Sequence, residues 1–332
     1  MLSKLARAAP ARHARKLSTS SSRHVTKITD LSKAEVHEVL ALAASVKAHP
    51  ADYHDALRRK VLLMFFEKPS LRTRLSLETG MAQMGGHAIN YELGSSPLGV
   101  GKELISDTAV VSSRYADAIT ARVRTRHQIA ALAEHSTVPV VNALDDFAHP
   151  CQILADMQTI VEQKGAIEGI KMAFVGDIRN NVTYDLMRAA HLVGFSCSVA
   201  GPSGPEYQPE SGVAEELAAI GGPGESRVCA TAEEAVSGAD VVYTDSWMSY
   251  GIPKAEADAR FKALLPFQVT EELMALTAPG AIFMNCLPAA RGEEQTSGVI
   301  DGPQSVVFDQ AENRLHAQKG LLLKLMGADR WL

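Results

Sequence analysis

The 332-residue sequence lacks any apolar run of 18 residues, so no membrane-spanning helix and no membrane partner are expected. It has only four cysteines, and their spacing matches neither a disulfide framework nor a zinc site. No cluster of His and Cys residues offers a metal site either. These absences are typical of a protein from a reducing compartment that binds no metal.

Two glycine motifs for nucleotide binding are also missing. No G-x-x-x-x-G-K-[ST] loop occurs, and the turn at residues 176–181 reads GDIRNN where a dinucleotide site would have G-x-G-x-x-G. The glycines that let a pyrophosphate approach the backbone are therefore absent. A nicotinamide dehydrogenase, suggested only by the α/β pattern around this turn, is disfavoured, and no cofactor is expected.

Acidic side chains are absent from residues 1–27, which contain seven Lys or Arg and many serines. This composition is typical of an organelle transit peptide. We expect residues 1–27 to direct the protein to the mitochondrial matrix, with removal between about Leu17 and Arg23. A chloroplast address and a plain basic tail are the alternatives. Because the rest of the chain is distinctly acidic, a nucleic-acid partner is disfavoured.

Apolar strand patterns alternate with helical patterns along the remaining chain, which predicts an α/β fold with parallel sheets. The expected strands cover residues 61–66, 87–93, 118–123, 138–143, 171–175, 196–200, 239–245 and 281–288. A glycine-flanked joint at 165–169 separates two α/β units. We expect a first domain at 28–155 that includes the C-terminal segment 308–332, and a second domain at 156–307.

The stretch that follows the first strand has the features of a phosphate site. Ser70 is a suitable N-cap, so a helix starting there would present free N–H groups and the positive end of its dipole. The same turn carries the hydroxyl of Thr73 and the guanidinium groups of Arg72 and Arg74. Such donors suit phosphate oxygens. Taken alone, the stretch could equally be an ordinary N-cap with solvated arginines.

Polar residues also follow the predicted strands of the second unit. Asn181, Asp245 and Cys286 come after three separate strands, at the carboxyl ends where open α/β sheets bind ligands. In the first unit, His149 and Gln152 stand in the first turn of another predicted helix. The sequence therefore predicts polar groups beyond the strand ends of each unit.

Together these segments resemble the aspartate/ornithine carbamoyltransferase family. Five blocks match in the same order, at residues 66–74 (FEKPSLRTR), 121–123 (ARV), 149–152 (HPCQ), 286–289 (CLPA) and 310–316 (QAENRLH). One block is only moderately specific, whereas five in order are highly specific, and the resemblance runs from about residue 28 to 328. Segments 176–182 and 245–251 are similar to the ornithine-binding segments of the family.

The resemblance implies carbamoyl transfer from carbamoyl phosphate to the side-chain amine of L-ornithine, giving L-citrulline and phosphate, as in arginine biosynthesis or the urea cycle. It further implies a carbamoyl-phosphate domain and a Rossmann-like amino-acid domain around a cleft, assembled as a homotrimer. The implied carbamoyl-phosphate residues are Ser70, Leu71, Arg72, Thr73, Arg122, His149, Gln152, Cys286, Leu287 and Arg314. Those implied for ornithine are Asn181, Asp245, Ser249 and Tyr250, and those for catalysis are Asp245, Cys286, Arg122 and His149.

Three positions depart from the family pattern. Leu71 replaces a usual threonine, Asn285 replaces a histidine before Cys-Leu-Pro, and Tyr250 replaces a methionine. Tyr250 would line the place of the acceptor side chain, where a phenol changes both volume and polarity. Transfer to another amine, such as an N-acylated ornithine or putrescine, and a non-catalytic carbamoyl-phosphate-binding relative are therefore kept as alternatives.

Overall fold

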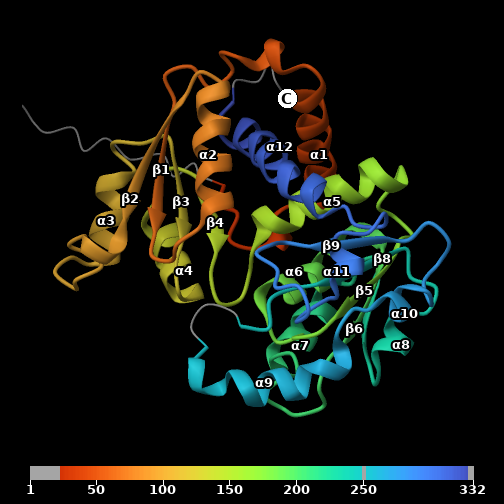
Figure 1. Ribbon diagram of the computed structural model, residues 1–332. Coiled ribbons are helices and arrows are strands. Elements are labelled where there is room, and N and C mark those ends of the chain that lie inside the picture. The colour runs from red at the N-terminus through yellow and green to blue at the C-terminus, as the bar shows by residue number, and fades with distance from the viewer. Residues whose placement is uncertain (1–22, 249–251, 328–332) are drawn as a thin grey trace, which may run out of the picture.

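The computed structural model describes residues 23–248 and 252–327, which form two parallel sheets with helices packed around them (Figure 1). The first sheet has the strand order β2-β1-β3-β4 and the second has the order β7-β6-β5-β8-β9. All neighbouring strands run parallel. The predicted fold class, two parallel-sheet α/β units, is confirmed.

The strands are β1 (Val61–Phe66), β2 (His87–Glu92), β3 (Ala118–Arg122), β4 (Val140–Leu144), β5 (Lys171–Val175), β6 (Ser196–Ala200), β7 (Glu225–Cys229), β8 (Val241–Thr244) and β9 (Ile282–Asn285). The helices are α1 (Lys33–Ala48), α2 (Leu71–Gln83), α3 (Ile105–Ser112), α4 (Arg126–His135), α5 (Pro150–Lys164), α6 (Asn181–Ala189), α7 (Ser211–Ile220), α8 (Ala232–Val236), α9 (Ala257–Leu264), α10 (Glu271–Met274), α11 (Ser297–Ile300) and α12 (Val307–Met326).

Local sequence accounts for most of these elements. Ser32 caps α1 in a reciprocal capping box with Glu35, and Ser70 caps α2. The strand prediction missed β7 because this edge strand reads Glu-Ser-Arg-Val-Cys and is largely exposed, so it has no apolar run. Within the described ranges, no helix is long and apolar enough to cross a membrane.

Helices α5 and α12 connect the two units. Residues 150–160 of α5 are all buried, and α12 packs against α1, α2 and α5 (Figure 1). One apolar cluster includes Val141 of β4, Ile153 of α5 and Met172 of β5, so it reaches both sheets. The predicted domain boundary at residues 155 and 156 thus falls inside a helix whose sides face both units.

The structure includes the last residues of the predicted transit peptide in the fold, whereas residues 1–22 lie outside the described part of the chain. Val25 is fully buried, its N–H donates to the Val140 carbonyl at 2.8 Å, and its carbonyl accepts the Asn142 N–H at 2.8 Å. A leader that ended at residue 27 would remove this pairing with β4. Removal before His24 would keep the pairing intact.

Candidate active site

The phosphate-like stretch and Arg122 meet at the switch point of the first sheet. The chain leaves β1 toward β2 on one side and returns to β3 on the other, which opens a crevice at the strand ends. Arg122 ends β3 opposite Phe66, and its carbonyl accepts the Glu67 N–H at 2.9 Å. The first turn of α2 therefore begins beside the Arg122 end of β3.

Arg314 of α12 reaches the first turn of α2 and also α5. The Ser70 hydroxyl accepts the Thr73 N–H at 3.2 Å, while the buried Thr73 hydroxyl accepts from Arg314 Nη2 at 3.0 Å. Arg314 Nη1 donates to Gln152 Oε1 at 2.6 Å. Leu71, the first residue of α2, has an exposed side chain, so its backbone and not its side chain contributes to this turn. Thr73, Gln152 and Arg314, predicted from three distant blocks, are thus in direct contact.

His149 is buried at the N-terminus of α5. Its backbone N–H donates to Asp185 Oδ2 at 2.9 Å, while its Nδ1 finds no hydrogen-bond partner among the described residues. Burial, together with the charges of Arg314, Arg122 and Arg72, lowers the pKa of His149 well below its ordinary value. The imidazole is therefore neutral near pH 7 and can donate one hydrogen bond without carrying a charge.

Asp245 and Cys286 form a pair at the carboxyl ends of two strands of the second sheet. They follow the adjacent strands β8 and β9, and the Cys286 thiol donates to Asp245 Oδ1 at 3.0 Å. Desolvation, with the Asp245 charge as a further cause, raises the pKa of Cys286 well above its ordinary value. Desolvation also raises the pKa of Asp245, although the hydrogen bond from Cys286 acts to lower it. The sulfur is a protonated thiol at neutral pH.

Arg72 links the two units across the site. Its guanidinium donates to the Leu287 carbonyl in the turn after β9. Asn181, the first residue of α6, donates from Nδ2 to the Asp145 carbonyl at 2.6 Å, so it too bridges the second unit to the first. Ser249 and Tyr250 lie outside the described residues.

A buried acidic residue that sequence reasoning missed lies directly behind Gln152. Asp156 is fully buried and accepts hydrogen bonds from Gln152, Gln310 and Tyr243. Burial raises its pKa to about 7, although the hydrogen bonds that it accepts act to lower this pKa. The available signal was the polar i, i+4 pair Gln152 and Asp156, which encloses the apolar residues 153–155.

The arrangement is suited to an anion and to a polarised carbonyl rather than to a metal. Three guanidinium groups, from Arg72, Arg122 and Arg314, act on the same buried imidazole. Such fixed donors stabilise both a phosphate and an oxyanion that develops beside it. Across the described ranges, no group of three or more His, Cys, Asp or Glu side chains is placed to hold a metal ion.

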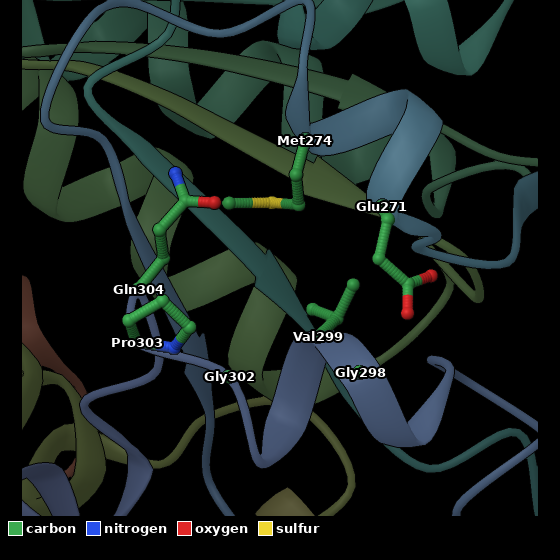
Figure 2. Close-up of a pocket in the computed structure, with 7 residues that line it drawn as sticks. All are labelled: Glu271, Met274, Gly298, Val299, Gly302, Pro303 and Gln304. Carbon is green, nitrogen blue, oxygen red and sulfur yellow. The ribbon is translucent and has the colours of Figure 1, made fainter.

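A small pocket lies elsewhere, between α10 and α11 (Figure 2). It has a volume of about 140 Å³ and is lined in part by Glu271 and Met274 of α10 and by Gly298 and Val299 of α11. None of its lining residues belongs to the predicted site. A second pocket of about 380 Å³ lies beside Glu67, at the edge of the candidate site.

The chain matches two family models that together cover most of its length. Residues 23–162 match the aspartate/ornithine carbamoyltransferase carbamoyl-P binding domain, and residues 168–325 match the Asp/Orn binding domain. The ornithine carbamoyltransferase of Anoxybacillus flavithermus is 46% identical over 304 residues, which are 90% of this chain and 95% of that protein.

Solved structures agree with the sequence comparison. The ornithine transcarbamoylase of Giardia lamblia superimposes with a TM-score of 0.84 at 44% identity, covering 92% of this chain and 98% of that one. A mitochondrial ornithine carbamoyltransferase from Coccidioides immitis gives 0.82 at 35% identity, covering 92% and 98%. The chain therefore belongs to the aspartate/ornithine carbamoyltransferase family of enzymes, among its ornithine carbamoyltransferases.

Proposed function

We propose that the protein transfers the carbamoyl group of carbamoyl phosphate to the side-chain amine of L-ornithine, giving L-citrulline and phosphate, in arginine biosynthesis or the urea cycle. The observation that carries this proposal is the contact of Arg314 with both Thr73 and Gln152, beside the neutral His149. The side chains of these residues place hydrogen-bond donors next to one another. The Cys286–Asp245 pair lies at the strand ends of the second unit.

The carbamoyl phosphate is held at both ends in this proposal. Its phosphate binds Ser70, Thr73, Arg72, Arg122 and the backbone N–H of Leu71. The carbonyl oxygen faces donors from Arg122, His149, Thr73 and Arg314. As the amine attacks the carbonyl carbon, negative charge grows on that oxygen, and preorganised donors are worth most at that moment. The carbon–oxygen bond to phosphate then breaks, and phosphate leaves with the bonding electrons.

The carbamoyl NH₂ needs hydrogen-bond acceptors. Gln152 presents Oε1 on the side of Arg314, and this oxygen has a second lone pair for the NH₂. The Leu287 carbonyl, now bonded to Arg72, is the second acceptor, together with the carbonyl near Cys286. We infer that phosphate draws Arg72 away and so exposes the Leu287 carbonyl to the substrate.

The ornithine is bound by the second unit in this proposal. Asp245 suits an ammonium group, while Asn181, Ser249 and Tyr250 are assigned to the rest of the acceptor. The attacking nitrogen must first lose a proton, because an alkylammonium has a pKa of about 10 and no lone pair. Asp245 is the acceptor assigned to that proton, and Cys286, whose thiol donates to Asp245, is assigned to hold this carboxylate in place. Positioning of the amine against the carbonyl supplies much of the remaining acceleration.

The test is carbamoyl transfer by the full chain with L-ornithine, N-acetylornithine, putrescine and aspartate in parallel, following phosphate and the ureido product. Citrulline from ornithine, with the other three at background, is the expected result. Preferred turnover of another amine would reject the ornithine assignment but keep the phosphate site. No product from any amine, by a folded protein that binds carbamoyl phosphate, would reject the reaction itself.

The homotrimer is part of the same proposal. Several large apolar side chains of the first unit are exposed, including Leu75 of α2, Ile89 and Tyr91 of β2, and Val110 and Val111 of α3. A subunit interface would bury exposed apolar side chains of this kind. Sedimentation equilibrium should give three times the mass of the chain, and a monomer at micromolar concentration would contradict it.

The mitochondrial address and the division of the chain into two domains at residues 155 and 156 complete the proposal. The basic, acid-free composition of residues 1–22 supports an address, and one solved relative is described as mitochondrial. A fluorescent protein fused behind residues 1–23 should enter mitochondria in a eukaryotic cell. A fusion that enters plastids would select the chloroplast, and a diffuse fusion would reject a targeting role.

A further inference from the structure

Asp156 lies behind the candidate site at a junction of both structural units. It is on α5 and is fully buried, one helical turn beyond Gln152. Its Oδ1 accepts from Gln152 Nε2 at 2.8 Å and from Gln310 Nε2 at 2.7 Å. Its Oδ2 accepts from the Tyr243 hydroxyl at 3.1 Å. One carboxylate thus joins side chains from α5, α12 and β8.

The carboxylate determines which end of the Gln152 amide faces the substrate. Because Nε2 donates to Asp156, Oε1 is the end that accepts from Arg314. A flipped amide would set its oxygen against a carboxylate oxygen and its NH₂ against a guanidinium donor, which is unfavourable at both ends. Gln152 is therefore held as an acceptor, the role that a carbamoyl NH₂ requires.

The same carboxylate acts on the turn after β9 through Gln310. With Nε2 donating to Asp156, Gln310 presents Oε1 to the Asn285 N–H at 2.9 Å. Asn285 Oδ1 in turn accepts the N–H of Leu287 at 2.8 Å. Leu287 has a φ of 56°, in the left-handed region that is costly for a branched residue, so this turn needs such support.

We infer that Asp156 is a positioning residue. It holds Gln152 Oε1 and the Leu287 carbonyl where both can accept hydrogen bonds from the carbamoyl NH₂. This inference rests on the proposed donor substrate, carbamoyl phosphate. It assigns to Asp156 no contact with substrate and no proton transfer. It predicts a selective defect, because the phosphate group is bound by residues of the α2 turn that Asp156 does not touch.

The test compares carbamoyl phosphate with inorganic phosphate, which has no NH₂ group, on the full chain. Asp156→Ala should raise the KM for carbamoyl phosphate about tenfold or more, since the loss of oriented buried hydrogen bonds weakens binding of the carbamoyl end. The inhibition constant for inorganic phosphate and the KM for ornithine should each stay within twofold. General damage to the site would weaken phosphate as well.

Two variants make the comparison specific. Asp156→Asn should recover the KM to within about threefold of the wild type, because its Oδ1 still accepts from both glutamines while its NH₂ faces the Tyr243 oxygen. Thr159→Val is the matched control. Thr159 is equally buried one turn further along α5, where its hydroxyl accepts from Asn313 of α12 at 3.0 Å, and its loss should leave both constants unchanged.

Gln310→Met tests the support that Gln310 gives to the turn at Leu287. It also takes the place of Asp156→Ala if that variant does not fold. It removes the acceptor of the Asn285 N–H but keeps the Gln152–Asp156 contact, and we expect a three- to tenfold rise in the same KM. The inference is overturned if the variants at Asp156 and Gln310 leave this KM unchanged, if they weaken phosphate equally, or if Thr159→Val behaves as they do.

Failure of the proposed reaction gives a different result. If the wild type binds carbamoyl phosphate but forms no citrulline, the acceptor assignment fails, and the ratio of carbamoyl phosphate to phosphate affinity, measured by calorimetry, still tests Asp156. If the wild type binds no carbamoyl phosphate, both proposals are rejected.

Discussion

His149 is a neutral imidazole surrounded by permanent positive charge. Burial and the guanidinium groups of Arg314, Arg122 and Arg72 together oppose its protonation. A neutral imidazole keeps a donor N–H for a substrate carbonyl at any pH near neutrality. The low pKa of His149 destabilises the folded protein at acidic pH, because the unfolded chain binds a proton at His149 that the folded chain does not.

The free energy of unfolding should show this cost. Since the folded pKa of His149 lies well below the unfolded value of 6.5, stability is lost as the pH falls below 6.5, at about 1.4 kcal/mol per pH unit. His149→Gln removes this dependence. The free energy of unfolding is measured in urea at pH 7.5 and at pH 5.5. Between these two values it should fall by about 1.4 kcal/mol more in the wild type than in the variant. A difference that stays constant would mean that the folded protein protonates His149.

Asn285 shows how one residue can support a turn in place of another type. The family pattern has histidine there, whereas Asn285 uses its side chain twice, accepting the Leu287 N–H and donating to Gln295 Oε1 at 3.0 Å. The contact with Gln295 is buried and the one with Leu287 is partly buried. The position therefore acts through the geometry of the turn, which explains why an asparagine can occupy it.

Among the elements, the short segment before α1 has contacts that its charge pattern does not reveal. His24 to Lys27 read as part of a basic leader, yet Val25 pairs with Val141 next to β4, and His24 Nδ1 accepts the Val140 N–H at 3.1 Å. Sequence composition cannot reveal this pairing, because the partner strand lies more than a hundred residues further along the chain.

Truncation separates the two parts of this segment. A chain that starts at Arg23 should unfold at the same temperature as one with residues 1–22 present. A chain that starts at Ile28 loses the burial of Val25 and two backbone hydrogen bonds, so its free energy of unfolding should fall by about 2 kcal/mol or more. Equal melting temperatures for the two truncations would show that the pairing contributes nothing to stability.

For the whole molecule, helix α12 returns the end of the chain to its beginning. It packs against α1 and α2 while its Arg314 enters the candidate site, so stability and site geometry depend on the same helix. The two helices α12 and α1 lie close together at Gly320, where an added Cβ would lie 2.5 Å from the Val39 carbonyl oxygen of α1. The sequence alone gives Gly320 the appearance of a weak point in a helix.

Gly320→Ala should therefore destabilise the protein despite the higher helix propensity of alanine. Overpacking against backbone costs about 1–3 kcal/mol, which exceeds the propensity gain of about 1 kcal/mol. Gly80→Ala in α2 is the matched control, because its Cβ would meet side chains and no backbone: Lys319 at 3.3 Å and Leu315 at 3.6 Å. Thermal unfolding should show a lower melting temperature for Gly320→Ala alone, and equal shifts for both would contradict the argument.

The sequence by itself determined the fold class, the Ser70 cap with its arginines and the strand ends that carry Asp245 and Cys286. These features depend on neighbours within a few residues, through apolar periodicity, capping and the carboxyl-end rule for parallel strands. Only the tertiary structure decided the contact of Asp156 with Gln310, which are 154 residues apart, and the pairing of residues 24–26 with β4. No local pattern specifies such a contact, because the partners are brought together only when α5 and α12 pack between the two sheets.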